Sequence, residues 1–246
     1  MLKVKPERIY LRYMHLGDII TSFNILYNLG LQYDLHFEIC GQNPDVYKHL
    51  FHIFDYRNHI RRLEFCPWKE GYKTLYFSNF LKDHYLNVCM GIGTVSAKRL
   101  NGFCLPTCKL NVSKLDDFLC FHFQCRSVEE RKSFHSENIK HAFKKFETKK
   151  SICIGGNETK KYIHDRDAYF GDLSSLAHKL LESSGFFGID SGMAHLAGTL
   201  GVKGDVIVQA KYEHFFMNVK NSFEFMYPSM VIHSKNSIAK IPVVKI

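Results

Sequence analysis

The sequence predicts an α/β protein built from two successive units of alternating strands and helices. Short apolar runs rich in β-branched and aromatic residues alternate with segments whose apolar residues recur at helical spacing. This pattern loosens between about residues 80 and 117, where Gly, Pro, Ser and Asn are frequent, and it then restarts. The chain has 246 residues, 46% of them hydrophobic, which is enough for a substantial core in one large or two small domains.

The first half begins with a predicted strand over 8–14, RIYLRYM, and a predicted helix over 19–30. Ile19, Phe23 and Leu26 share one face of that helix, and Gly30 is its expected C-terminal stop. A strand over 35–40, a helix over 43–54 and a further short apolar run over 59–66 follow. Strands joined through helices are typical of parallel pairing in a βαβ arrangement.

The second half repeats the pattern, and we expect each half to form one Rossmann-like domain. The predicted boundaries are 1–115 for the first domain and 116–246 for the second. Two such domains would face each other across a cleft, with ligands at the carboxyl ends of the strands. The expected strands cover 118–124, 150–156 and 185–190, and the expected helices cover 135–148, 173–185 and 191–201.

Composition limits the class of protein and its partners. The formal net charge of +9, from 33 Lys and Arg against 24 Asp and Glu, favours attraction to an anionic partner. The N-terminus lacks the apolar region of a signal peptide, and the sequence contains no apolar run that could span a membrane, so we expect a cytoplasmic protein.

The eight cysteines predict reduced thiols rather than disulfides. Cys120 and Cys153 lie within apolar runs and are expected in the core. The spacing of Cys104, Cys108, Cys120 and Cys125 matches that of structural zinc ligands only loosely, so burial is the preferred interpretation and no metal is expected.

The most informative stretch is GFFGIDSGMAHLAGTLG, residues 185–201. An apolar strand ends at Asp190, and apolar residues then resume at helical spacing from Met193. Gly192 would let a ligand approach the backbone closely, and the free N–H groups of the first helical turn suit a phosphate. In the alternative interpretation, Asp190 or Ser191 only caps the helix and His195 is structural.

A resemblance favours the ligand-binding interpretation. The pattern GxDSGxxHLAxxLG resembles the donor-site signature of the heptosyltransferases, the family 9 glycosyltransferases of the GT-B fold. A second match is RYMHLGDIITSF at 12–23, with Gly17 and Asp18 in the expected places. The strand and loop FHFQCRSVEERKSF give a partial third match, through His122, Gln124, Cys125, Arg126, Lys132 and Phe134. Here Phe134 replaces the family's Trp, the loop is slightly longer, and Arg131 is the alternative to Lys132. The first signature is carried by Gly188, Asp190, Ser191, Gly192, His195, Leu196, Ala197, Leu200 and Gly201.

The sequence also departs from the family pattern. The proline that usually follows the final Leu-Gly is absent from GVKGDVIVQ, and the middle of the first domain shows no matching motif. The resemblance implies a GT-B-like protein with an acceptor-side domain over 1–115 and a nucleotide-sugar donor domain over 116–246. The family resemblance says least about the acceptor-binding half of the chain.

The resemblance implies specific roles. Asp18, at the first turn of a helix where the dipole favours its ionised form, would be the catalytic base, although it could instead be an ordinary helix cap. Asp190 would hold a sugar or ribose hydroxyl, and His195 would contact phosphate or sugar. The donor diphosphate would bind the amides of Ser191, Gly192 and Met193, with Arg126 or Lys132 neutralising charge. The remaining predicted donor-site residues are Gly17, Gln124 and Gly188.

No cofactor is expected beyond the nucleotide-sugar co-substrate, because the donor half has no pair of carboxylates at a strand end. Asp165 and Asp167 lie in a polar loop and are interpreted as solvated. The predicted function is a metal-independent, inverting glycosyltransferase that acts on an anionic acceptor, such as a lipopolysaccharide-type glycan at the inner membrane face. Two alternatives remain: a phage-type enzyme that glycosylates hydroxymethylated bases in DNA, and an inactive nucleotide-sugar-binding module.

Overall fold

The computed structural model describes residues 6–11, 15–62, 73–75, 100, 102–115, 117–123, 150–156, 168–208 and 213–234. It is an α/β structure with parallel sheets, as predicted. The chain divides into two compact units, Met1–Leu110 and Asn111–Ile246. The predicted domain limits, 1–115 and 116–246, stay a prediction, and each unit is described by itself.

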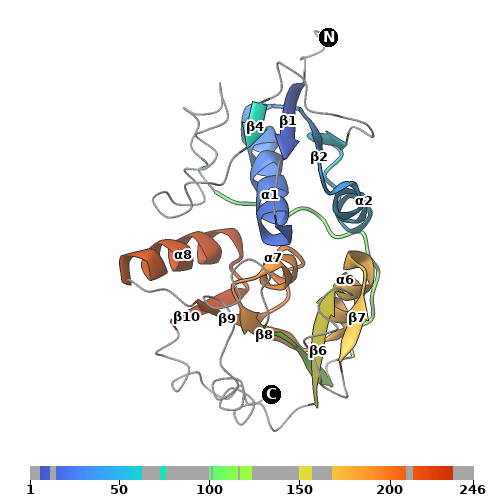
Figure 1. Cartoon of the computed structure of the whole chain (residues 1–246), viewed down its shortest axis with the longest axis vertical. Coiled ribbons are helices and arrows are strands. Elements are labelled where there is room, and N and C mark those ends of the chain that lie inside the picture. The colour runs from blue at the N-terminus through green and yellow to red at the C-terminus, as the bar shows by residue number, and fades with distance from the viewer. Residues whose placement is uncertain are drawn as a thin grey trace. The chain divides into compact units, whose positions relative to one another are not determined.

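The first unit contains a sheet of four parallel strands in the order β3-β2-β1-β4 (Figure 1). Helix α1 (Leu16–Tyr33) connects β1 to β2, and helix α2 (Pro44–Ile53) connects β2 to β3, as parallel neighbours require. Figure 1 shows α1 lying against this sheet. The strands are β1 (Glu7–Leu11), β2 (Phe37–Gly41), β3 (Ile60–Arg62) and β4 (Lys73–Leu75).

Aromatic side chains hold α1 in place. Phe23 packs against Tyr47 and Tyr56 with ring centroids 5.7 and 5.3 Å apart, and the Tyr56 hydroxyl donates to Asn24 Oδ1 over 2.6 Å. The predicted stop at Gly30 is wrong, because α1 continues to Tyr33 and ends where Asp34 takes φ 53°. Gly30 instead allows His59 to pack on the helix, since a Cβ there would lie 2.4 Å from the His59 Cβ.

The second unit contains a sheet of six parallel strands in the order β10-β9-β8-β5-β6-β7. Renumbered from β5, this is the 3-2-1-4-5-6 order of the doubly wound dinucleotide-binding fold, whose switch point falls between β5 and β8. The strands are β5 (Phe118–His122), β6 (Lys150–Gly156), β7 (Tyr169–Gly171), β8 (Gly185–Ile189), β9 (Gly204–Val208) and β10 (Met230–Ser234).

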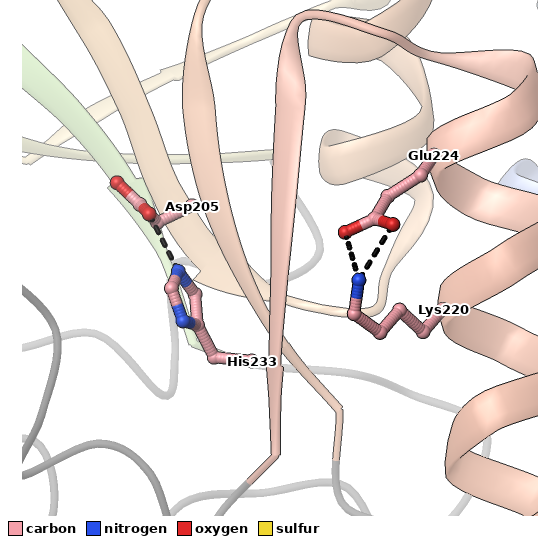
Figure 2. Close-up of polar contacts among 4 residues, drawn as sticks. All are labelled: Asp205, Lys220, Glu224 and His233. Atoms are coloured by element: carbon pink, nitrogen blue, oxygen red, sulfur yellow. Dashed lines mark hydrogen bonds and ion pairs between the residues drawn. The ribbon is translucent and has the colours of Figure 1, made fainter.

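Within the described part of this unit, three helices pack on the sheet: α6 (Leu173–Glu182), α7 (Gly192–Thr199) and α8 (Glu213–Met226). Helix α6 contacts β6 and β7, α7 contacts β8 and β9, and α8 contacts β9 and β10. Figure 2 shows two polar pairs on opposite sides of β10. His233 Nε2 lies 2.6 Å from Asp205 Oδ1 and joins β10 to β9, whereas Lys220 and Glu224 pair at 2.6 Å along α8.

The predicted core positions of Cys120 and Cys153 are confirmed, because both residues are buried. Burial raises the pKa of Cys120 to about 12, so its thiol stays protonated at neutral pH. Within the described ranges, no helix is both long enough and apolar enough to cross a membrane.

The contact between β5 and β8 gives a stability prediction. Gly188 is buried, and a Cβ there would lie 2.5 Å from the backbone oxygen of His122, which the sheet holds in place. We expect Gly188→Ala to lower the free energy of unfolding by about 1–3 kcal/mol, measured by urea denaturation. Gly102→Ala is the control, because a Cβ there meets no atom within 4 Å. Equal stability of the two variants would contradict this packing.

Candidate functional site

The turn between β8 and α7 lies beside the switch point of the second sheet. The Asp190 N–H donates to the Ile207 oxygen over 3.2 Å, so pairing with β9 continues one residue past β8. Ser191 is the N-cap, with extended backbone at φ −154° and ψ 170°, and α7 begins at Gly192. The N–H groups of the first turn have no acceptor within the helix and carry partial positive charge at the carboxyl edge of the sheet.

Ser191 is unusual for an N-cap. Its residue is only 6% exposed, and its side chain makes no capping hydrogen bond. Its buried Oγ has no hydrogen-bond partner among the described residues. Leaving a buried hydroxyl without a partner costs about 1–3 kcal/mol, and such a group calls for an explanation. A ligand oxygen at the start of α7 would supply the missing partner.

Behind this turn, Asp190, His195 and Tyr227 form a row of polar groups. His195 is 3% exposed, and its Nδ1 lies 3.1 Å from the Tyr227 hydroxyl. Its Nε2 lies 3.5 Å from Asp190 Oδ1, while the Asp190 side chain remains 16% exposed. The Phe223 ring packs on the imidazole with centroids 4.7 Å apart. His195 is therefore a buried group behind Asp190, and its contact with phosphate or sugar stays a prediction.

In the first unit, Asp18 lies at the third position of α1. Its Oδ2 accepts a hydrogen bond from the His15 N–H over 3.1 Å, as in a capping box. The carboxylate is half-buried and Gly17 precedes it in the same turn. Asp18 thus has the geometry of a helix cap, and its role as a base stays a prediction.

The remaining predicted site residues lie in β5, in β8, in α7 or outside the described residues. Gly188 is a packing position within β8, and Met193 is buried in the first turn of α7. His122, the last residue of β5, is buried with Nδ1 2.7 Å from the Ile154 oxygen and so ties β5 to β6. Gln124, Arg126 and Lys132, which the sequence predicts in the donor site, lie outside the described residues.

Sequence reasoning missed Tyr227 and Phe223. Both come from the segment after residue 210, which carries no motif that indicates a function. The available signal was their spacing, since an aromatic residue four positions after another lies on the same helical face. That spacing predicts packing, but it does not indicate that the partner is a histidine on another helix.

The sequence matches no protein-family model, and it matches no curated protein. Solved structures do match. The dodecameric, iron-containing heptosyltransferase TibC in complex with ADP-D-β-D-heptose is 15% identical, with a TM-score of 0.65 over 95% of this chain and 64% of that chain. This chain therefore spans less than two thirds of the length of TibC.

Two further structures are similar over most of both chains. A family 9 glycosyltransferase from Veillonella parvula is 13% identical, with a TM-score of 0.59 over 99% of this chain and 92% of that one. The E. coli ADP-heptose lipopolysaccharide heptosyltransferase II is 9% identical, with a TM-score of 0.59 over 96% and 95%. The fold is that of the heptosyltransferases. At these identities the likeness concerns the fold, and the resemblance predicted from the sequence is confirmed at that level.

TibC is described as iron-containing. Across the described ranges of this chain, no three His, Cys, Asp or Glu side chains lie together as metal ligands. Metal-independent catalysis stays a prediction.

The state of Ser191 gives a second prediction. Replacing an N-cap serine by alanine usually costs about 1 kcal/mol, because a capping hydrogen bond is lost. Ser191 makes no such bond, so we expect Ser191→Ala to leave the free energy of unfolding unchanged or to raise it by up to about 1 kcal/mol. The control is Asp172→Ala on α6, where the carboxylate accepts from the Ser175 N–H over 2.8 Å.

Both variants are measured by urea denaturation, and Asp172→Ala is expected to lose about 1 kcal/mol. A comparable loss in Ser191→Ala would mean that the serine hydroxyl stabilises α7. In that case the orphaned hydroxyl would not mark a ligand site.

Proposed function

We propose that this chain is a glycosyltransferase that moves a sugar from a nucleotide-diphosphate sugar to an acceptor hydroxyl. The observation that carries the proposal is the buried Ser191 hydroxyl, without a partner among the described residues, at the start of α7 beside the switch point of a doubly wound sheet. Similarity of fold adds support, since TibC was solved with ADP-D-β-D-heptose and the E. coli heptosyltransferase WaaC, at a TM-score of 0.51, with ADP.

The start of α7 would bind the donor diphosphate. The main-chain amides of Ser191, Gly192 and Met193 would donate to phosphate oxygens, and the Ser191 hydroxyl would gain its partner there. These donors are fixed by the helix, so they stabilise the charge that builds on the departing diphosphate without reorganising. Arg126 or Lys132 is the proposed cation that neutralises this charge, in place of a metal ion.

Asp190 would hold a hydroxyl of the ribose or the sugar, because its carboxylate lies at the edge of the same turn and is 16% exposed. Asp18 would take the proton of the acceptor hydroxyl as that oxygen attacks the anomeric carbon. The bond from the anomeric carbon to the diphosphate oxygen breaks, and its electron pair leaves with the nucleoside diphosphate. A single displacement of this kind inverts the anomeric configuration.

An anionic acceptor suits the net charge of +9. We propose a lipopolysaccharide-type glycan, because one structural neighbour is a lipopolysaccharide heptosyltransferase. A binding module without catalysis is the second candidate, and one observation favours it: the Asp18 carboxylate already serves as a cap for α1.

A panel experiment tests the function. The protein is incubated with ADP-, UDP- and GDP-sugars together with surface glycans or hydroxymethylated DNA, and the products are examined by mass spectrometry. We expect a mass increase on a glycan together with release of a nucleoside diphosphate. Transfer to DNA alone would exclude the glycan acceptor, and binding without any transfer would support the binding module. A protein that binds none of these nucleotides is not a glycosyltransferase of this kind.

The role of Asp18 is tested by two substitutions that separate the base from the cap. Asp18→Asn keeps a side-chain oxygen for the His15 N–H but removes the base, whereas Asp18→Ala removes both. We expect each variant to lose at least about 100-fold in kcat while nucleotide affinity stays near wild type. Only Asp18→Ala should also lose about 1 kcal/mol of stability. Wild-type turnover by Asp18→Asn would leave Asp18 with the capping role alone.

A further inference from the structure

Tyr227 is held tightly against α7. It is fully buried, and its ring lies over Gly198, where a Cβ would be 2.5 Å from the Tyr227 Cγ. Glycine at 198 thus lets the ring come close enough for the hydroxyl to reach His195 Nδ1, 3.1 Å away. The Phe223 ring fills the remaining space, with its centroid 4.9 Å from that of Tyr227 and 4.7 Å from the imidazole.

The sheet edge fixes the position of Tyr227. The residue follows α8 directly, and its N–H donates to the Phe223 oxygen over 2.7 Å. Its own oxygen accepts from the Met230 N–H over 2.9 Å, at the start of β10. Strand β10 pairs with β9 along its whole length, and the Asp205–His233 contact in Figure 2 also joins the two strands. The backbone of Tyr227 is therefore anchored between α8 and β10.

The three polar groups determine where the protons lie. An ionised Asp190 carboxylate can only accept, so the His195 Nε2 that faces it carries a hydrogen. In the neutral imidazole, Nδ1 is then an acceptor, and the Tyr227 hydroxyl donates to it. Tyr227 thereby selects the His195 tautomer that attracts Asp190.

The Asp190 carboxylate could instead cap the N-terminus of α7. Aspartate favours the start of a helix, because its carboxylate caps the free N–H groups and the dipole attracts negative charge. A carboxylate there would occupy the position that a phosphate needs. In the structure Asp190 instead faces His195, and Ser191 lies at the N-cap.

We propose that Tyr227 is a positioning residue: acting through His195, it holds the Asp190 carboxylate away from the first-turn amides of α7 and leaves them open to the donor diphosphate. This inference rests on the proposed function, because it assigns the amides of α7 to a nucleoside diphosphate. It adds the residue that follows α8 to the groups that shape the donor site.

A double-mutant cycle with Asp190 tests the proposal. Affinity for ADP, UDP and GDP is measured by titration calorimetry, and the tightest binder is used throughout. We expect Tyr227→Phe to weaken binding about fivefold to tenfold, the value of about one hydrogen bond. In an Asp190→Ala background the same substitution should change affinity less than about twofold, because no carboxylate remains to be restrained.

Tyr56→Phe is the matched control. Tyr56 is also fully buried, and its hydroxyl makes a 2.6 Å hydrogen bond to Asn24 Oδ1 in the other unit. Both Tyr→Phe variants should lose similar stability, but only Tyr227→Phe should lose nucleotide affinity. Nitrogen-15 NMR of His195 supplies an independent readout: the Nε2–H tautomer should dominate in the wild type and lose that dominance in Tyr227→Phe.

The outcomes separate the two proposals. Equal loss of affinity in both Asp190 backgrounds would make Tyr227 a structural residue only, and unchanged affinity in Tyr227→Phe would overturn the inference as well. In either case nucleotide binding by the wild type leaves the proposed function standing. A wild-type protein that binds no nucleoside diphosphate would refute the proposed function and the positioning role together.

Discussion

The parallel pairing of β8 with β5 on one side and β9 on the other is the constraint on which the candidate site depends. It places the carboxyl end of β8 at the switch point of the sheet and forces the chain to turn there. Gly188 makes this pairing possible, because only a residue without a Cβ fits against the His122 oxygen. Asp190, Ser191 and the first turn of α7 are arranged by that junction.

The sequence predicted the strands and helices that can be recognised from the spacing of their own apolar residues. Strand β8 is a continuous buried run, and apolar residues recur at helical spacing through α7, so both were predictable from local spacing. The short strands β4 and β7 were not predicted, because three residues give too little periodicity. Strand β9 was also missed, since its VIV core stands between a glycine-rich turn and polar residues that resemble a loop.

The residues of the candidate site also fall into those that local sequence predicts and those that it does not. The turn at 190–192 was predicted, because a strand, an Asp-Ser-Gly and a helix follow one another in the chain. The partners of His195 were not, because Phe223 and Tyr227 reach it from another helix and from the turn after it. Likewise, the spacing placed a stop at Gly30, where the glycine is needed for a contact with His59, a residue distant in the sequence. Tertiary contacts of this kind leave no local pattern to detect.

The N-terminus of α7 differs from the other described helix N-termini in how it is capped. Helix α6 begins with Asp172, whose carboxylate caps the Ser175 N–H, and α1 begins with a capping box. Helix α2 lacks a side-chain cap at Asn43, but that residue is half-exposed, so water can serve its amides. At α7 the residue is a favoured capping type, it is buried, and its hydroxyl still makes no bond within the described residues. Among the described residues, side chains cap α1 and α6, whereas the Ser191 hydroxyl has no partner and the adjacent Asp190 carboxylate faces His195. This is the arrangement expected where an outside anion completes the cap.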